Sequence, residues 1–171
     1  STGFQEWYLI LEILLNREDI KIEIKNDKFT LERSGHPAND LSEGEKSAIA
    51  FSYFLTELKA LRDDDPPKIP KTIIFIDDPI SSLDSNHIFQ VRSLLKDFFK
   101  KDDFAQLFIS THNFEFFSML MDSEELFHRQ KPTKADFYFI KRLDSNETSI
   151  IHLPNSFKQY NSEYVSLFHI L

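Results

Sequence analysis

Two adjacent carboxylates, Asp77 and Asp78, directly follow the apolar run that extends from Ile73 to Ile76. A short, unbroken apolar run bounded by turn residues is typical of a strand that is buried on both faces of a parallel sheet. The carboxylates then lie at the carboxyl end of the strand, where open α/β sheets place their ligand chemistry. A hydrophobic strand that ends in an acidic residue can hold magnesium in a nucleotide-hydrolysing site. On this stretch alone, a core strand followed by a polar turn is an equally good interpretation.

A second group of residues suited to ligand binding begins a helix at positions 41–46. Ser42 can cap this helix, and Glu45, three residues later, completes a capping box. The free backbone N–H groups and the positive dipole end of a helix N-terminus favour an anion such as a phosphate. Ser42 adds a hydroxyl, and Gly44 allows a ligand to approach the backbone closely. Taken alone, an ordinary capping box is the simpler interpretation.

The elements that position the carboxylates form a strand–helix–strand unit. The central strand is followed by a helix from about Ser85 to Lys100 and by a second apolar strand over Leu107–Ile109, which leads into His112. That order predicts a right-handed parallel crossover. The crossover brings the ends of the two strands side by side, so that Asp77–Asp78 and His112 meet at one edge of the sheet.

The other predicted elements surround this unit. A helix from about Glu43 to Leu61 precedes the central strand, and its buried stripe consists of Ala48, Phe51, Leu55 and Leu58. The remaining elements, in chain order, are a helix over Phe4–Leu15, a hairpin over Asp19–Arg33 that turns at Asn26–Asp27, a loop over Ser34–Asp40, an exposed connector over Arg62–Lys71, a helix over Phe114–Met121, a hairpin over Asp136–Leu143 and Thr148–Leu153, and the start of a helix over Ser162–Leu171.

Composition limits the class of protein. The chain has 171 residues and 41% hydrophobic residues, which is enough for one domain with a core of its own. A formal net charge of -8 argues against a broad nucleic-acid-binding face on this segment. The chain has no cysteine, which excludes disulfides and thiolate metal sites. With no signal peptide and no apolar run long enough to span a membrane, a cytoplasmic protein is expected.

Four motifs follow one another in a specific order: LSEGEK at 41–46, TIIFIDD at 72–78, SSLD at 81–84 and STHN at 110–113. This order resembles the C-terminal lobe of an ABC-type ATPase head, with its signature motif, Walker B strand, D-loop and switch histidine. Within that superfamily the motifs look most like those of the anticodon-nuclease (PrrC/RloC-type) group, which acts in bacterial defence. SMC-like and DNA-repair heads are the next closest group.

The resemblance implies a role for each matching residue, with ATP and Mg²⁺ as cofactors. Asp77 would hold magnesium through water. Asp78 stands where most such ATPases carry a glutamate that polarises the attacking water, and His112 would reach the γ-phosphate. The expected nucleotide-binding and interface residues are Ser42, Gly44, Glu45, Ser82 and Asp84. Ser42 and Gly44 would contact a γ-phosphate bound to another subunit, although Glu43 replaces the second glycine of the usual signature motif.

No segment of the chain matches the phosphate loop G-x-x-x-x-G-K-[ST]. In the family that loop lies far upstream, on an N-terminal lobe. We therefore expect residues 1–171 to form a single lobe of a larger ATPase. The expected fold is α/β, with a mostly parallel central sheet flanked by helices and with β-hairpins at its margins. The expected partners are the Walker A lobe of the parent chain, a second head joined by ATP-dependent dimerisation, and RNA or DNA through the parent protein, but no membrane.

Three other interpretations remain. An SMC-like DNA-repair head would carry a long coiled coil in its insertion, and a nucleotide-gated regulatory module with little turnover would carry an appended basic nuclease domain. A two-metal nuclease centre within this segment would need further acidic residues near Asp77 and Asp78, and Asp136 and Asp144 have no supporting context. The other histidines, which show no metal-ligand spacing, are His36, His87, His128, His152 and His169.

Overall fold

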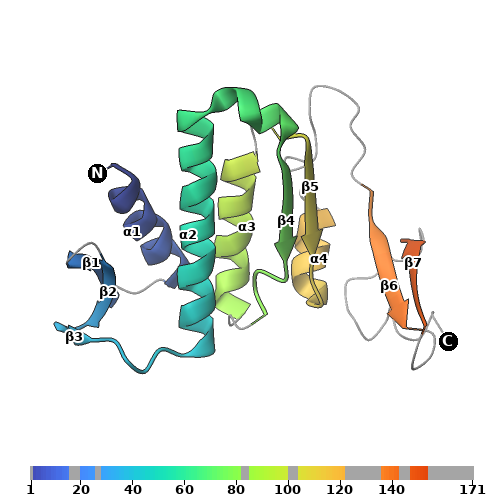
Figure 1. The fold of residues 1–171 in the computed structure, drawn as a ribbon. Coiled ribbons are helices and arrows are strands. Elements are labelled where there is room, and N and C mark those ends of the chain that lie inside the picture. Colours follow the sequence, from blue (N-terminus) through green and yellow to red (C-terminus); the bar gives the residue numbers. More distant parts are fainter. Residues whose placement is uncertain are drawn as a thin grey trace. The chain divides into compact units, whose positions relative to one another are not determined.

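The computed structural model describes residues 2–15, 20–25, 28–81, 85–99, 104–121, 136–142 and 147–153 (Figure 1). The chain divides into two compact units, Ser1–Asn113 and Phe114–Leu171, which are described separately. All residues of the four motifs belong to the first unit. None of the described helices is long and apolar enough to cross a membrane.

The first unit has a helical core made by α1 (Thr2–Leu15) and α2 (Glu43–Asp64). The two helices pack against each other, and α1 also contacts α3 (Ser85–Phe99). A buried polar contact links the two helices: Nε1 of Trp7 donates to Oγ of Ser52 at 2.9 Å. The helix predicted over Phe4–Leu15 is confirmed. The predicted stripe on α2 is buried at all four of its positions, Ala48, Phe51, Leu55 and Leu58.

Helix α2 continues one turn beyond the predicted end at Leu61. The backbone N–H of Asp65 still donates to the carbonyl of Leu61 at 3.0 Å, so the run of aspartates completes the last turn. The prolines that follow form a 3₁₀ helix, η1 (Pro66–Lys71), which buries Ile69. Proline suits the start of a helix because its missing N–H would have no partner there. The stretch predicted as a connector thus begins as the last turn of α2 and continues as η1, and it is exposed or half-buried except at Ile69.

An antiparallel hairpin precedes α2. Strands β1 (Ile20–Lys25) and β2 (Lys28–Arg33) pair as predicted, with Ile22 opposite Leu31. A short third strand, β3 (His36–Pro37), lies in the stretch predicted to be a loop. It pairs with β2 because Ser34 and Gly35 both adopt positive φ, 51° and 82°, as a two-residue type I′ turn requires.

The strand–helix–strand unit is also confirmed. Strands β4 (Ile73–Asp77) and β5 (Gln106–Ser110) pair in parallel, and α3 connects them. The register places Asp77 opposite Ser110, at the carboxyl end of both strands. Figure 1 shows the pair beside α2 and α3 in the first unit. Helix α3 buries one stripe at helical spacing, Ile88, Val91 and Leu95.

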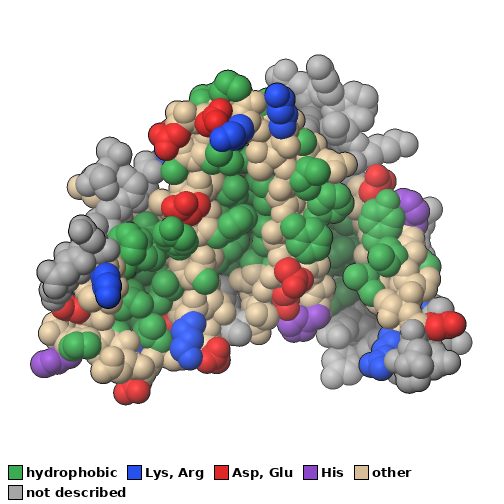
Figure 2. All heavy atoms as spheres, in the orientation of Figure 1, with side chains coloured by type: hydrophobic (Ala, Val, Ile, Leu, Met, Phe, Trp, Pro, Cys, Tyr) green, Lys and Arg blue, Asp and Glu red, His purple; other side chains and the backbone are tan. Residues whose placement is uncertain are grey.

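The parallel pair buries only one of its faces. Ile74 and Ile76 of β4 are buried, whereas Ile73 and Phe75 are 61% and 65% exposed. Phe108 of β5 is on the exposed side too, with its ring centroid 6.0 Å from that of Phe75. Figure 2 shows hydrophobic side chains on the surface along these strands. A central strand buried on both faces was thus the wrong prediction for this chain.

The second unit contains α4 (Phe114–Met121) and a hairpin of β6 (Tyr138–Arg142) and β7 (Thr148–His152). The hairpin is antiparallel, with Ile140 opposite Ile150, and both it and the helix are predicted correctly. The helix predicted over Ser162–Leu171 lies outside the described residues. The fold as a whole is of the expected α/β class, with a parallel pair in the first unit and an antiparallel hairpin in each unit.

Candidate functional site

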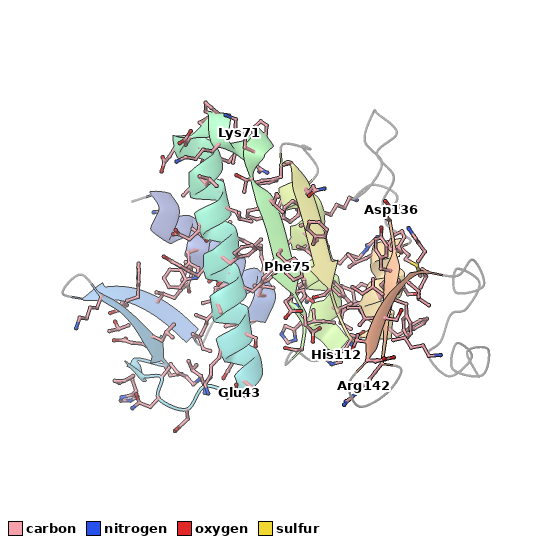
Figure 3. All side chains as sticks on the ribbon, turned by 45° about the vertical axis from the view of Figure 1, so that its right-hand side comes forward. Glu43, Lys71, Phe75, His112, Asp136 and Arg142 are labelled. Carbon is pink, nitrogen blue, oxygen red and sulfur yellow. The ribbon has the colours of Figure 1, made fainter. Side chains whose placement is uncertain are left out.

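The carboxyl ends of β4 and β5 bring five polar residues together. We call this group the carboxylate edge, and its members are Asp77, Asp78, Ser110, Thr111 and His112. The backbone N–H of Asp78 donates to the carbonyl of Ser110 at 2.8 Å, which extends the parallel pairing by one step beyond β4. The sequence prediction that Asp77–Asp78 and His112 meet at one edge is confirmed. In Figure 3, His112 lies at the lower end of the strand pair and Phe75 lies higher on β4.

The backbone of Asp78 turns sharply after the strand. Its φ of 45° is in the left-handed region, which aspartate tolerates better than most residues with a side chain. The carbonyl of Asp78 then accepts from the N–H of Ser81 at 3.1 Å, and Pro79 occupies the second position of this tight turn. The chain therefore leaves the sheet at once, and the Asp78 side chain stays at the end of β5.

Each carboxylate of the edge accepts a hydrogen bond from one hydroxyl. Oγ of Ser110 donates to Oδ1 of Asp77. Oγ1 of Thr111 donates to Oδ1 of Asp78 at 3.0 Å and itself accepts from the backbone N–H of Asn113 at 3.1 Å. The two aspartates, although adjacent in sequence, thus have separate partners on the neighbouring segment.

His112 contacts the second oxygen of Asp78. Its Nδ1 lies against Oδ2 of Asp78, and its side chain is 73% exposed whereas that of Asp78 is 21% exposed. An ionised carboxylate can only accept hydrogen bonds, so Nδ1 of the ring carries the hydrogen in this pair. Nε2 is then the ring nitrogen that can meet a ligand in solvent. Asp78 orients the imidazole in this arrangement.

The carboxylate edge fits a magnesium ion that is held mainly by water and phosphate. Asp77 is exposed at the strand end and offers carboxylate oxygen, the ligand type that Mg²⁺ prefers. Within the described part of the chain, no group of three or more histidine and acidic side chains is arranged so that it could hold a metal ion by itself. An all-protein cage is therefore not formed by these residues, and one or two carboxylates beside a nucleotide are the usual alternative for Mg²⁺. Asp136 and Asp144 were considered as further acidic residues for a two-metal nuclease. Asp136 is exposed in the second unit, and Asp144 lies outside the described residues.

The start of α2 forms the capping box that the sequence predicts. Oγ of Ser42 accepts from the N–H of Glu45 at 3.2 Å, and the Ser42 N–H donates to Oε2 of Glu45 at 2.8 Å. Ser42 is exposed and Gly44 is half-buried. The Ser42 hydroxyl therefore lies at the surface next to the first backbone N–H groups of the helix, a position suited to binding an anion.

Glu45 has a structural task at this helix start. Its other oxygen, Oε1, accepts a hydrogen bond from Nη2 of Arg33, the last residue of β2. Burial of the carboxyl disfavours its charged form, but hydrogen bonds from the Ser42 backbone and from Arg33 outweigh that effect and hold its pKa below the ordinary value of 4.5. A contact between Glu45 and a nucleotide stays a prediction. Arg33 was not among the predicted residues, because its partner lies on another element.

Both groups of residues lie at one end of the first unit. In Figure 3, Glu43 at the start of α2 and His112 are both at the lower end, whereas Lys71 at the end of η1 is at the upper end. Ser82 and Asp84, the predicted D-loop residues, lie outside the described residues. The described part of the candidate site thus consists of the carboxylate edge and the capped start of α2.

The comparisons with known proteins define the class. The model of the AAA_13 family, described as an AAA domain, matches residues 11–171, and the chain belongs to this family. A solved structure from work on the ATP-driven dimerization and DNA-stimulated activation of SMC ATPases has the same fold, with a TM-score of 0.57 and 12% identity. The match covers 98% of this chain and 91% of that one. The chain is thus a P-loop ATPase-type domain with the fold of an SMC ATPase head.

Curated relatives come from Staphylococcus aureus. The chromosomal cassette SCCmec type IVc protein CR006 of strain MRSA252 is 30% identical over 178 aligned positions. A second Staphylococcus aureus protein of the same name matches equally well. The alignment covers 98% of this chain but only 23% of the relative. The chain therefore spans less than a quarter of the length of the proteins that it matches.

Proposed function

We propose that the chain is the C-terminal lobe of an ABC-type ATPase head that binds and hydrolyses ATP with Mg²⁺ at a dimer interface. The observation that carries this proposal is the carboxylate edge, where Asp77, Asp78 and His112 share the ends of two parallel strands. Asp77 holds the magnesium ion, Asp78 polarises the attacking water, and His112 presents Nε2 to the γ-phosphate. Residues 1–171 form one lobe in this proposal.

A Walker A lobe elsewhere in the parent chain completes the nucleotide site. The phosphate loop is absent from this sequence, and relatives are long enough to contain it, since the chain covers 23% of their length. The exposed apolar face of β4 and β5 is a second reason to propose this Walker A lobe, which would cover it. Parallel strands are usually covered on both faces, and Ile73, Phe75 and Phe108 are exposed here.

A second head supplies the other half of each ATP site. Ser42 and Gly44 lie at the start of α2, where backbone N–H groups point outward along the helix axis. Their phosphate would therefore come from the nucleotide of another subunit. The solved SMC ATPase with this fold is described as dimerising in response to ATP. ATP-driven dimerisation is proposed for the parent of this chain as well, with an RNA- or DNA-directed effector under its control.

Substitutions at the two aspartates test the proposed roles in the full-length protein. Asp78→Asn keeps the size of the side chain and an oxygen acceptor for Thr111, so ATP binding should persist while hydrolysis is lost. Asp77→Asn removes a charge from the metal shell and should weaken Mg²⁺-dependent ATP binding itself. Calorimetry and phosphate release measure the two effects. Normal hydrolysis by Asp78→Asn would exclude Asp78 as the residue that polarises water.

Mixing two inactive variants tests the dimeric site. Ser42→Arg should block the phosphate pocket at the start of α2, so the protein binds ATP but neither dimerises nor hydrolyses it. In a heterodimer with Asp78→Asn, one composite site carries both lesions and the other carries neither, so at most one site recovers. Light scattering with ATP and phosphate release on the mixture give the result. Normal ATP-driven dimerisation of Ser42→Arg would count against 41–46 as a signature motif.

An SMC-like DNA-repair head is the second candidate, because the fold is that of an SMC ATPase head. DNA-stimulated ATP hydrolysis by the full-length protein would favour it. Cleavage of RNA that depends on bound nucleotide, with little turnover, would instead favour a gated module of an anticodon-nuclease type.

A further inference from the structure

We propose that Ser110 and Thr111 are positioning residues, and that each orients one of the two aspartates of the carboxylate edge. Ser110 orients Asp77 for the cation, and Thr111 orients Asp78 for the attacking water. This inference rests on the proposed ATPase function and assigns two residues to which the motif comparison gives no role. Each acts through the carboxylate that it contacts.

Each of the two hydroxyls contacts a different carboxylate. Oγ of Ser110 donates to Asp77, and Oγ1 of Thr111 donates to Asp78 at 3.0 Å. Ser110 lies within β5 directly opposite Asp77, while Thr111 is the first residue beyond the strand. Asp77 likewise ends β4, while Asp78 is the first residue beyond it. Adjacent hydroxyls can therefore serve adjacent carboxylates without competing for the same one.

The Thr111 hydroxyl is held in one direction. The N–H of Asn113 donates to Oγ1 of Thr111 at 3.1 Å, which occupies one of its lone pairs. The hydroxyl hydrogen is then directed to Oδ1 of Asp78. Because His112 contacts Oδ2 of the same carboxylate, both oxygens of Asp78 are held, and rotation of the carboxylate would break one contact or the other.

The two carboxylates are held to different degrees. Asp78 is half-buried between a hydroxyl and an imidazole, whereas Asp77 is exposed and accepts from the Ser110 hydroxyl. A fixed carboxylate suits the orientation of one water molecule, and an exposed carboxylate suits a hydrated cation. Partners that orient ligand residues typically contribute about 10-fold to 100-fold to metal affinity or activity.

The test separates metal binding from turnover in the full-length protein. Ser110→Ala should weaken Mg²⁺-dependent ATP binding in calorimetry by about tenfold, while ATP binding in EDTA stays near wild type. Thr111→Val should leave Mg²⁺-ATP affinity unchanged and lower kcat by about tenfold or more. Thr111→Ser restores the hydroxyl and should recover most of the turnover.

Thr72→Val is the matched control for Thr111→Val. Thr72 directly precedes β4, is half-buried like Thr111, and donates its hydroxyl to the carbonyl of Lys68 at 2.9 Å, away from the carboxylates. The Thr72→Val variant should leave both Mg²⁺-ATP binding and kcat near wild type. The inference is overturned if Thr111→Val matches this control, if Thr111→Ser is as impaired as Thr111→Val, or if Ser110→Ala lowers kcat without changing Mg²⁺ dependence. Wild-type protein without Mg²⁺-dependent ATP binding would instead refute the proposed function itself.

Discussion

Removal of the Glu45 carboxylate should destabilise the protein, because one side chain holds both the start of α2 and the end of β2. Glu45 is 8% exposed, and its two oxygens accept from the Ser42 N–H and from Arg33. Glu45→Ala removes both contacts together. It also leaves the Arg33 guanidinium without this carboxylate.

The size of the effect follows from these contacts. Loss of the reciprocal half of a capping box costs about 0.5 to 1 kcal/mol. A hydrogen bond to a charged group contributes about 1.5 kcal/mol or more, but the Arg33 side chain is 32% exposed, so water compensates part of its loss. The free energy of unfolding should therefore fall by about 2 kcal/mol for Glu45→Ala. Glu45→Gln keeps an acceptor and should cost about 1 kcal/mol.

The pH dependence has a definite sign. The pKa of Glu45 is lowered in the folded protein, so its ionised form stabilises the fold above the unfolded value of about 4.5. That contribution is lost as pH falls from 4.5 through the folded value. The difference in unfolding free energy between wild type and Glu45→Gln should therefore be full at about pH 7 and shrink as the pH falls below about 4.5.

Urea unfolding of wild type, Glu45→Ala and Glu45→Gln measures these differences, with Arg33→Met completing a double-mutant cycle. Glu43→Ala is the matched control on the same helix turn. Glu43 is 77% exposed and pairs with Lys46 at 2.6 Å, so its removal should cost about 0.5 kcal/mol or less. The reasoning is refuted if Glu43→Ala and Glu45→Ala are equally destabilising, or if Glu45 and Arg33 show no coupling energy in the cycle.

Three further outcomes are expected. Ser52→Ala should destabilise by about 1 to 3 kcal/mol, because the buried Trp7 Nε1–H loses its acceptor, and thermal unfolding of this variant beside Trp7→Phe measures it. Leu55→Ala should cost about 2 to 5 kcal/mol, since Leu55 is 0% exposed, whereas Leu9→Ala, at a position 57% exposed on α1, should cost much less in the same assay. The isolated 171-residue chain should show no tight Mg²⁺-ATP binding in calorimetry and no steady phosphate release, because its sequence has no phosphate loop.

Local patterns predicted those parts of the fold that depend on nearby residues. The capping box of Ser42 and Glu45 needs only three residues of helix, and the stripe on α2 follows from helical spacing. The meeting of Asp78 and His112 also followed, because parallel strands joined by a crossover align their carboxyl ends.

Other features depend on contacts that no local pattern contains. Arg33 reaches Glu45 because the hairpin lies beside the start of α2, which the spacing along the chain does not reveal. The apolar run of β4 predicted burial on both faces, but periodicity cannot tell which partner covers a face or whether that partner is in the same chain. The end of α2 was misplaced because proline stops a helix only where its ring would meet a preceding carbonyl, and Asp65 still precedes that point.

The left-handed backbone of Asp78 restricts how this position can vary in evolution. Aspartate, asparagine and glycine adopt such a conformation readily, whereas other residues pay roughly 1 kcal/mol or more. A glutamate at this position would therefore have to overcome a backbone penalty, and its longer side chain would also displace the contacts with Thr111 and His112. A change from aspartate to glutamate would therefore be favoured by a simultaneous change in the turn at 78–81 that relieves the left-handed backbone.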